Sequence, residues 1–111
     1  MKTALVTGGS RGIGKSISIT LGKSHHVLVG YISSQEKAEE VVNEITKSGG
    51  NANSIEINIS SKESVDKAFA TIEDDFGSVD ILINNAGITK DNILPRMKEK
   101  EWLDVIQTNL T

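Results

Sequence analysis

Residues 7–14, with the sequence Thr-Gly-Gly-Ser-Arg-Gly-Ile-Gly, decide the fold of this chain. They follow a short apolar run, residues 3–6, and precede a stretch of helical period. A glycine-rich turn between a strand and a helix is the arrangement that a dinucleotide-binding loop requires. Gly8 allows a sharp turn, Gly12 leaves room for a pyrophosphate, and Gly14 allows the helix to pack closely on the sheet. The amino end of that helix offers N–H groups and a positive dipole to phosphates.

Short β-rich runs alternate with longer stretches of helical period along the whole chain, as in βαβ units. The pattern predicts four strands, at residues 3–6, 27–32, 53–59 and 79–83. It predicts helices between them, at residues 15–23 and 35–48 and from Ser60, which forms a potential capping box with Glu63, to Phe76. A last helix is predicted from about Lys98, with Trp102, Val105 and Ile106 on one stripe.

This alternation predicts an α/β fold, a Rossmann-type doubly wound parallel sheet that is partial, with its first four strands in the order 3-2-1-4. Residues 1–111 are interpreted as one nucleotide-binding domain that is incomplete at its carboxyl end. The fourth strand, residues 79–83, is predicted to lie on an open edge that would invite association. The ligand crevice of such a sheet lies beyond the carboxyl ends of strands one and four, so chemistry is expected in the loops after Val6 and Ile83.

The composition excludes several classes of protein. The chain has 111 residues, a net charge of −3 and no cysteine. Disulfides, thiolate nucleophiles and cysteine-ligated metals are therefore excluded, and the adjacent histidines His25 and His26 lack a third ligand at metal-site spacing. The charge argues against a nucleic-acid partner, and the first residues lack the apolar length of a signal peptide or a membrane span. We expect a cytoplasmic protein without a bound metal.

Two motifs carry a resemblance to a known family. The spacing Thr-Gly-x-x-x-Gly-Ile-Gly at residues 7–14 resembles the signature of the short-chain dehydrogenase/reductase family, and Asn-Asn-Ala-Gly at residues 84–87 resembles its second signature. In the second motif, Ala86 and Gly87 let the backbone pass close to a cofactor ribose, while the Asn side chains tie strands together or bond the cofactor. The alternative interpretation of each motif is a turn with no ligand, but the position of the glycine loop between a strand and a helix favours nucleotide binding.

The residues after the second strand predict NADP as the cofactor. NAD-selective sites place an acidic residue about 20 residues past the glycines, and here that position is Tyr31. Arg11 would reach a 2′-phosphate as a cation, with Ser10 and Ser33 as hydroxyl donors. The candidate cofactor-binding residues are Gly8, Gly9, Ser10, Arg11, Gly12, Ile13, Gly14, Tyr31, Ser33, Asn58, Ile59, Asn85, Ala86 and Gly87. The pair Asn58-Ile59 is included because it is similar to the family's adenine-contacting pair, in which many relatives carry Asp.

The family resemblance also implies a reaction, hydride transfer to a carbonyl with a Tyr as the proton donor and a Lys four residues later. Asn109 matches the family's catalytic Asn, whose role is to hold a water. The single tyrosine, Tyr31, is followed four residues later by Gln35, so the chain has no Tyr-x-x-x-Lys pair. Family members are roughly twice as long, and we therefore expect a fragment that is inactive alone.

Residues 88–98 through Trp102 resemble one branch, the 3-oxoacyl-[acyl-carrier-protein] reductases of bacterial fatty-acid synthesis, from which Pro95 departs. The resemblance implies a 3-oxoacyl substrate bound to acyl-carrier protein or CoA, and a homotetramer for the complete protein. Acetoacetyl-CoA reductases share much of this segment, so an enzyme of that kind is an alternative. Two further alternatives come from other functional classes: a non-catalytic NADP-binding module, and a structural or interaction protein.

Overall fold

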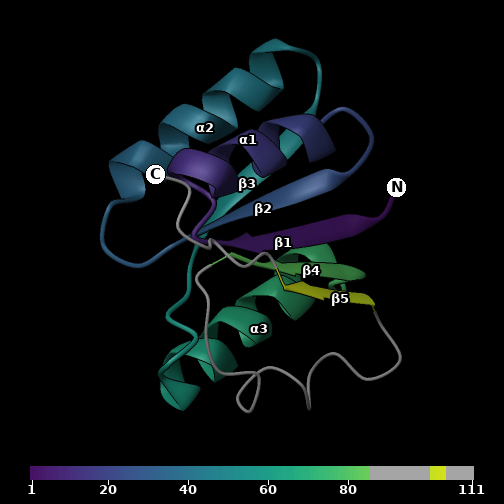
Figure 1. Cartoon of the computed structure of the whole chain (residues 1–111). Coiled ribbons are helices and arrows are strands. Elements are labelled where there is room, and N and C mark those ends of the chain that lie inside the picture. The colour runs from purple at the N-terminus through teal and green to yellow at the C-terminus, as the bar shows by residue number, and fades with distance from the viewer. Residues whose placement is uncertain (86–100, 105–111) are drawn as a thin grey trace.

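The computed structural model describes residues 1–85 and 101–104. Within them, five parallel strands form one sheet in the order β3-β2-β1-β4-β5 (Figure 1). In chain order the elements are β1 (Thr3–Thr7), α1 (Gly12–Leu21), β2 (His26–Tyr31), α2 (Gln35–Lys47), β3 (Asn51–Glu56), α3 (Lys62–Phe76), β4 (Ile81–Asn84) and β5 (Glu101–Asp104). The predicted order 3-2-1-4 of the first four strands is confirmed, and with it the doubly wound fold.

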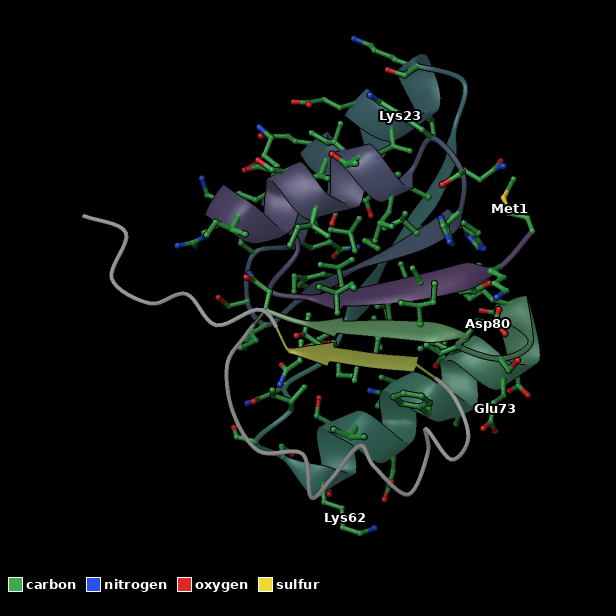
Figure 2. All side chains as sticks on the ribbon, turned by 45° about the vertical axis from the view of Figure 1, so that its right-hand side comes forward. Met1, Lys23, Lys62, Glu73 and Asp80 are labelled. Atoms are coloured by element: carbon green, nitrogen blue, oxygen red, sulfur yellow. The ribbon has the colours of Figure 1, made fainter. Side chains whose placement is uncertain are left out.

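Helices cover both faces of the sheet, α1 and α2 on one and α3 on the other (Figure 1). Alternate strand residues point to opposite faces, so each strand contributes side chains to the hydrophobic core on either side of the sheet. Ala4, Val6, Val27 and Val29 pack with α2, whereas Leu5, Leu28 and Leu82 pack with α3. All five residues of β1 are buried, which explains why the central strands are continuous apolar runs in the sequence. Figure 2 shows side chains filling the space between the helices and the sheet.

The third strand ends earlier than predicted. β3 stops at Glu56, although the isoleucines of residues 53–59 alternate up to Ile59. The backbone N–H of Ile57 still donates to the Tyr31 carbonyl at 2.8 Å, but the Asn58 side chain then accepts bonds from the N–H and the hydroxyl of Ser60. An Asn side chain that bonds two residues ahead stabilises a turn instead of a strand.

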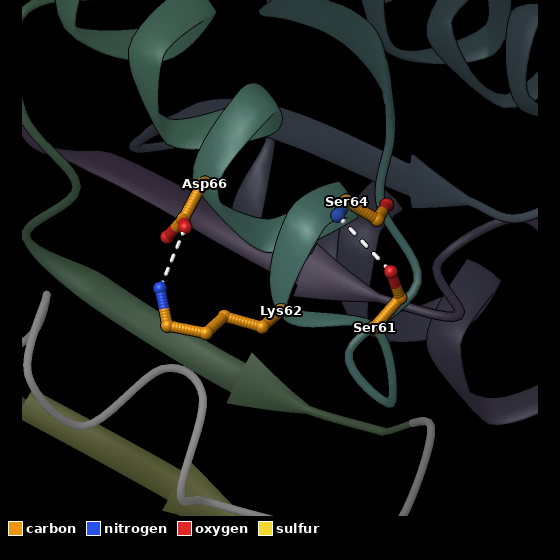
Figure 3. A network of polar contacts seen from close by, with 4 residues as sticks. All are labelled: Ser61, Lys62, Ser64 and Asp66. Carbon is orange, nitrogen blue, oxygen red and sulfur yellow. Dashed lines mark hydrogen bonds and ion pairs between the residues drawn. The ribbon is translucent and has the colours of Figure 1, made fainter.

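The same turn shifts the cap of α3 by one residue. The N-cap is Ser61, whose hydroxyl oxygen accepts the N–H of Ser64 at 3.1 Å, so the predicted capping box of Ser60 and Glu63 is wrong (Figure 3). The hydroxyl of Ser60 instead donates to the Asn58 side chain. Lys62 and Asp66, one turn apart, form an ion pair at 2.8 Å on the exposed surface.

The last predicted helix is wrong for the residues that the structure describes. Residues 101–104 form β5, which pairs with β4 in register, with Leu82 opposite Trp102. The edge of β4 presents N–H and C=O groups that need partners, and pairing there outweighs a helical pattern in the local sequence. The predicted open edge at residues 79–83 is therefore wrong as well. Val105 and Ile106 lie outside the described residues.

None of the helices in the described part of the chain has both the length and the hydrophobicity of a membrane span.

Candidate functional site

The glycine-rich loop joins the carboxyl end of β1 to the amino end of α1. Gly8 and Gly12 have φ angles of 62° and 51°, a left-handed conformation that residues with a side chain rarely adopt. Gly9 is fixed to the neighbouring strand because its N–H donates to the Gly30 carbonyl at 3.0 Å. A Cβ at Gly9 would lie 2.9 Å from the Val6 carbonyl oxygen, closer than real contacts allow. The backbone conformation of this loop therefore requires glycine at these positions.

The amino end of α1 has no side-chain cap. The N-cap residue is Arg11, in an extended conformation without a capping hydrogen bond, and the first turn contains no acidic residue. Around Gly12 there is open space, since a Cβ placed on it meets no atom within 4 Å. Ile13 and Gly14 complete this first turn. An uncapped helix terminus with free space in front of it can accept an anion.

The second predicted loop contacts the first one directly. The Asn85 side-chain amide donates to the Gly8 carbonyl at 3.1 Å, and the Asn85 backbone N–H donates to the Thr7 hydroxyl oxygen at 3.1 Å. A Cβ on Gly14 would collide with the Gly8 carbonyl oxygen and lie 2.6 Å from the Asn85 amide nitrogen. Asn85 thus ties the loop after β4 to the glycine loop, one of the two roles expected for it. Ala86 and Gly87 lie outside the described residues.

A pocket of about 220 Å³ opens between the glycine loop and the end of β2. It brings together five predicted residues from two parts of the sequence, and its lining consists of Gly8, Ser10, Arg11, Tyr31, Ile32, Ser33 and Ser34. The lining contains one cation, three hydroxyl side chains of serine and no carboxylate. Arg11 is exposed, and its guanidinium is available to an incoming ligand. Such a lining suits a phosphate group.

Two carboxylates near this pocket were not predicted. Glu56 is the register partner of Tyr31 in the β2–β3 ladder. Burial raises the pKa of the Tyr31 hydroxyl, and the negative charges of Glu56 and Glu39 raise it further. No local sequence pattern signals them, because the β2–β3 register brings Glu56 to the end of β2 and the packing of α2 on the sheet brings Glu39 there.

The two residues of the predicted adenine-contacting pair differ in burial. Asn58 lies in the turn after β3, where its side chain bonds to Ser60 and its backbone N–H donates to the Ser64 hydroxyl oxygen at 2.9 Å. Ile59 is buried and packs in the core beneath α3. Neither residue lines the pocket described above. The proposed catalytic Asn109 lies outside the described residues. The described part of the chain also contains no cluster of three side chains that could hold a metal.

The family description "short chain dehydrogenase" matches residues 2–111, almost the whole chain. The chain belongs to the short-chain dehydrogenase family. It is similar to the 3-oxoacyl-[acyl-carrier-protein] reductase FabG of Staphylococcus epidermidis, with 52% identity over 110 residues, and to that of Vibrio cholerae, with 46%. These alignments cover 98% and 99% of the chain but 45% and 44% of the relatives. The chain thus spans less than half the length of these curated relatives.

Solved structures of family members share the fold. A dehydrogenase/reductase from Sinorhizobium meliloti superposes with a TM-score of 0.72 and 41% identity, over 78% of this chain and 35% of that one. The angucycline C-6 ketoreductase LanV, solved with bound NADP, gives a TM-score of 0.69 and 39% identity, over 78% of this chain and 37% of its own. These likenesses agree with the sheet topology and with an oxidoreductase of this family.

Proposed function

We propose that this chain is the NADP-binding part of a reductase that converts a 3-oxoacyl thioester, carried by acyl-carrier protein, to the 3-hydroxyacyl form in fatty-acid synthesis. The observation that carries the cofactor assignment is the pocket formed by Ser10, Arg11, Tyr31 and Ser33 beside the glycine loop. The substrate assignment is supported by the similarity to reductases of that name. A cytoplasmic homotetramer is part of the same proposal.

The described residues fit the cofactor. The open space at Gly12 and the uncapped end of α1 would receive the pyrophosphate, because N–H groups and a positive dipole meet the negative charge there. Arg11 and the neighbouring serines would hold the ribose 2′-phosphate. Asn58 and Ile59 would lie near the adenine, and Ala86 and Gly87 near the second ribose. Asn85 would hold both loops in place through its bond to Gly8.

When bound, the reduced nicotinamide supplies the hydride for the carbonyl carbon. The oxygen that receives the electrons then needs a proton donor, and the chain has no Tyr-x-x-x-Lys pair to supply it, since Gln35 stands four residues after Tyr31. Asn109 would hold a water in the proton relay. The contribution of the described residues is therefore to bind and orient the cofactor.

We predict that the 111-residue chain alone does not reduce acetoacetyl thioesters, because hydride transfer without a proton donor leaves a developing alkoxide uncompensated. The same chain, extended by any coding sequence that follows Thr111, is expected to reduce them with NADPH. The measurement is NADPH oxidation with acyl-carrier-protein and CoA thioesters as substrates.

Three results of this experiment are informative. Turnover by the 111 residues alone would contradict the proposal that these residues bind the cofactor but lack the proton donor. A preference for the CoA thioester would favour an acetoacetyl-CoA reductase over the acyl-carrier-protein enzyme. Cofactor binding without turnover by the extended protein would favour a non-catalytic NADP-binding module.

A further inference from the structure

Tyr31, Glu56 and Glu39 share one face of the sheet. Tyr31 packs with the core under α2, and in a parallel ladder its register partner Glu56 projects to the same side. Ser54, two residues before Glu56 and so on the same face, donates its hydroxyl to the Glu39 carboxylate of α2. The two carboxylates therefore lie on the α2 side of the strand end from which Tyr31 lines the pocket.

These charges oppose the ligand for which the pocket is otherwise suited. A phosphate monoester carries between one and two negative charges at neutral pH. Arg11 is the cation of the pocket lining, and the lining itself has no carboxylate. The fields of Glu56 and Glu39 nevertheless reach the Tyr31 hydroxyl, since both raise its pKa. A phosphate beside Tyr31 would also be repelled by these charges.

We propose that Glu56, with Glu39 behind it, is a specificity-determining carboxylate pair that lowers the affinity of this pocket for a ribose 2′-phosphate. The inference rests on the proposed NADP site and deepens it. Arg11 attracts the 2′-phosphate and the carboxylate pair repels it, so the preference for NADP over NAD is the difference between the two. A nucleotide with a free 2′-hydroxyl carries no charge at this position and is affected little.

The expected effect is moderate because Glu56 is exposed and its field is screened. Coulomb's law in water at low ionic strength, for a doubly charged phosphate roughly 10 Å away, gives a change of about fourfold in affinity. We therefore expect Glu56→Gln to tighten NADP⁺ binding about fourfold and NAD⁺ binding by less than about 1.5-fold. Glu39→Gln should act in the same direction with a smaller effect, and high salt should reduce both effects.

The test measures the dissociation constants of NADP⁺ and NAD⁺ for the chain and its variants by calorimetry. Glu40→Gln is the matched control, because it makes the same charge change on an exposed residue of α2 next to Glu39. In parallel, the ionisation of the only tyrosine is followed by ultraviolet absorbance without any nucleotide. Glu56→Gln should lower the pKa of Tyr31, and Glu40→Gln should leave it nearly unchanged.

The outcomes separate this inference from the proposed function. If the parent chain binds NADP⁺ and Glu56→Gln lowers the pKa of Tyr31 without changing the NADP⁺ to NAD⁺ affinity ratio, the carboxylate pair is not a specificity determinant and the NADP site stands. If the parent chain binds neither nucleotide, the proposed function fails and the inference fails with it. Should Glu56→Gln not fold, an unchanged affinity ratio in Glu39→Gln overturns the proposal.

Discussion

Replacing Gly14 by alanine is expected to destabilise the protein by about 2 kcal/mol and to abolish measurable cofactor binding. The added methyl would collide with the Gly8 carbonyl oxygen and the Asn85 amide, which belong to the two loops of the site. Neither group can move without loss, because the Asn85 amide donates to that same carbonyl. The gain in helix propensity, about 1 kcal/mol, does not offset the collision. Urea denaturation and an NADPH titration measure the two effects.

Two other glycines provide the comparison. Gly12 and Gly49 both have a positive φ and open space at the Cβ position, so alanine should cost about 1 kcal/mol of backbone strain at either site. Gly12 lies at the amino end of α1, whereas Gly49 follows α2. Gly12→Ala should therefore weaken NADPH binding about tenfold, and Gly49→Ala should leave it unchanged. A Gly14→Ala variant as stable as the parent would contradict the close contact between the loops.

Arg11→Ala is expected to weaken NADPH binding by about tenfold or more and NADH binding by less than about twofold. Arg11 is the cation of the pocket lining, and a hydrogen bond to a charged phosphate contributes about 1.5–3 kcal/mol. Because Arg11 is exposed and gives no side-chain cap to α1, its removal should not affect folding. Fluorescence titration with both reduced nucleotides measures the change.

Lys23→Ala is the control for this variant. It removes the same charge from the chain just beyond the carboxyl end of α1, and Figure 2 shows Lys23 at the outer surface. Its NADPH affinity should equal that of the parent. Equal losses of NADPH and NADH affinity in Arg11→Ala would mean that Arg11 does not contact the 2′-phosphate.

The parts of the fold that local pattern determines were predictable. β1 is buried on both faces, and a continuous apolar run closed by glycines is the expected sequence of such a strand. α2 shows its apolar face at Ala38, Val41, Val42 and Ile45, all of which are buried. The order of the first four strands followed from the handedness of βαβ crossovers and agrees with the observed sheet.

The predicted secondary structure was wrong where two local interactions compete, or where a segment distant in the sequence determines the conformation. Ser60 was predicted to cap α3, but its hydroxyl bonds to Asn58 and Ser61 caps the helix. The alternating isoleucines after Glu56 continue a strand pattern, but Ile57 and Ile59 enter the core from a turn. The strand at residues 101–104 depends on the free edge of β4, which the local sequence does not display.

The residues of the candidate site that would bind the ligand were predictable from the sequence. The contacts among the residues of the site were less predictable. The glycine spacing and the absence of an acid at Tyr31 led to Ser10, Arg11 and Ser33, which the structure places in one pocket. The contact of Gly14 with Asn85 joins residues 71 positions apart, and the approach of Glu56 to Tyr31 depends on the β2–β3 register. Neither pairing leaves a signal in a single sequence.

The pocket beside the glycine loop is proposed to bind a nucleotide through its 2′-phosphate, and the decisive measurement is an equilibrium titration of the purified chain with NADPH and NADH. The two nucleotides differ only in that phosphate, so the ratio of their dissociation constants isolates the contribution of the pocket lined by Arg11. We expect saturable binding of NADPH, about tenfold or more tighter than that of NADH. Equal affinities for the two nucleotides, or the absence of saturable NADPH binding, would contradict it.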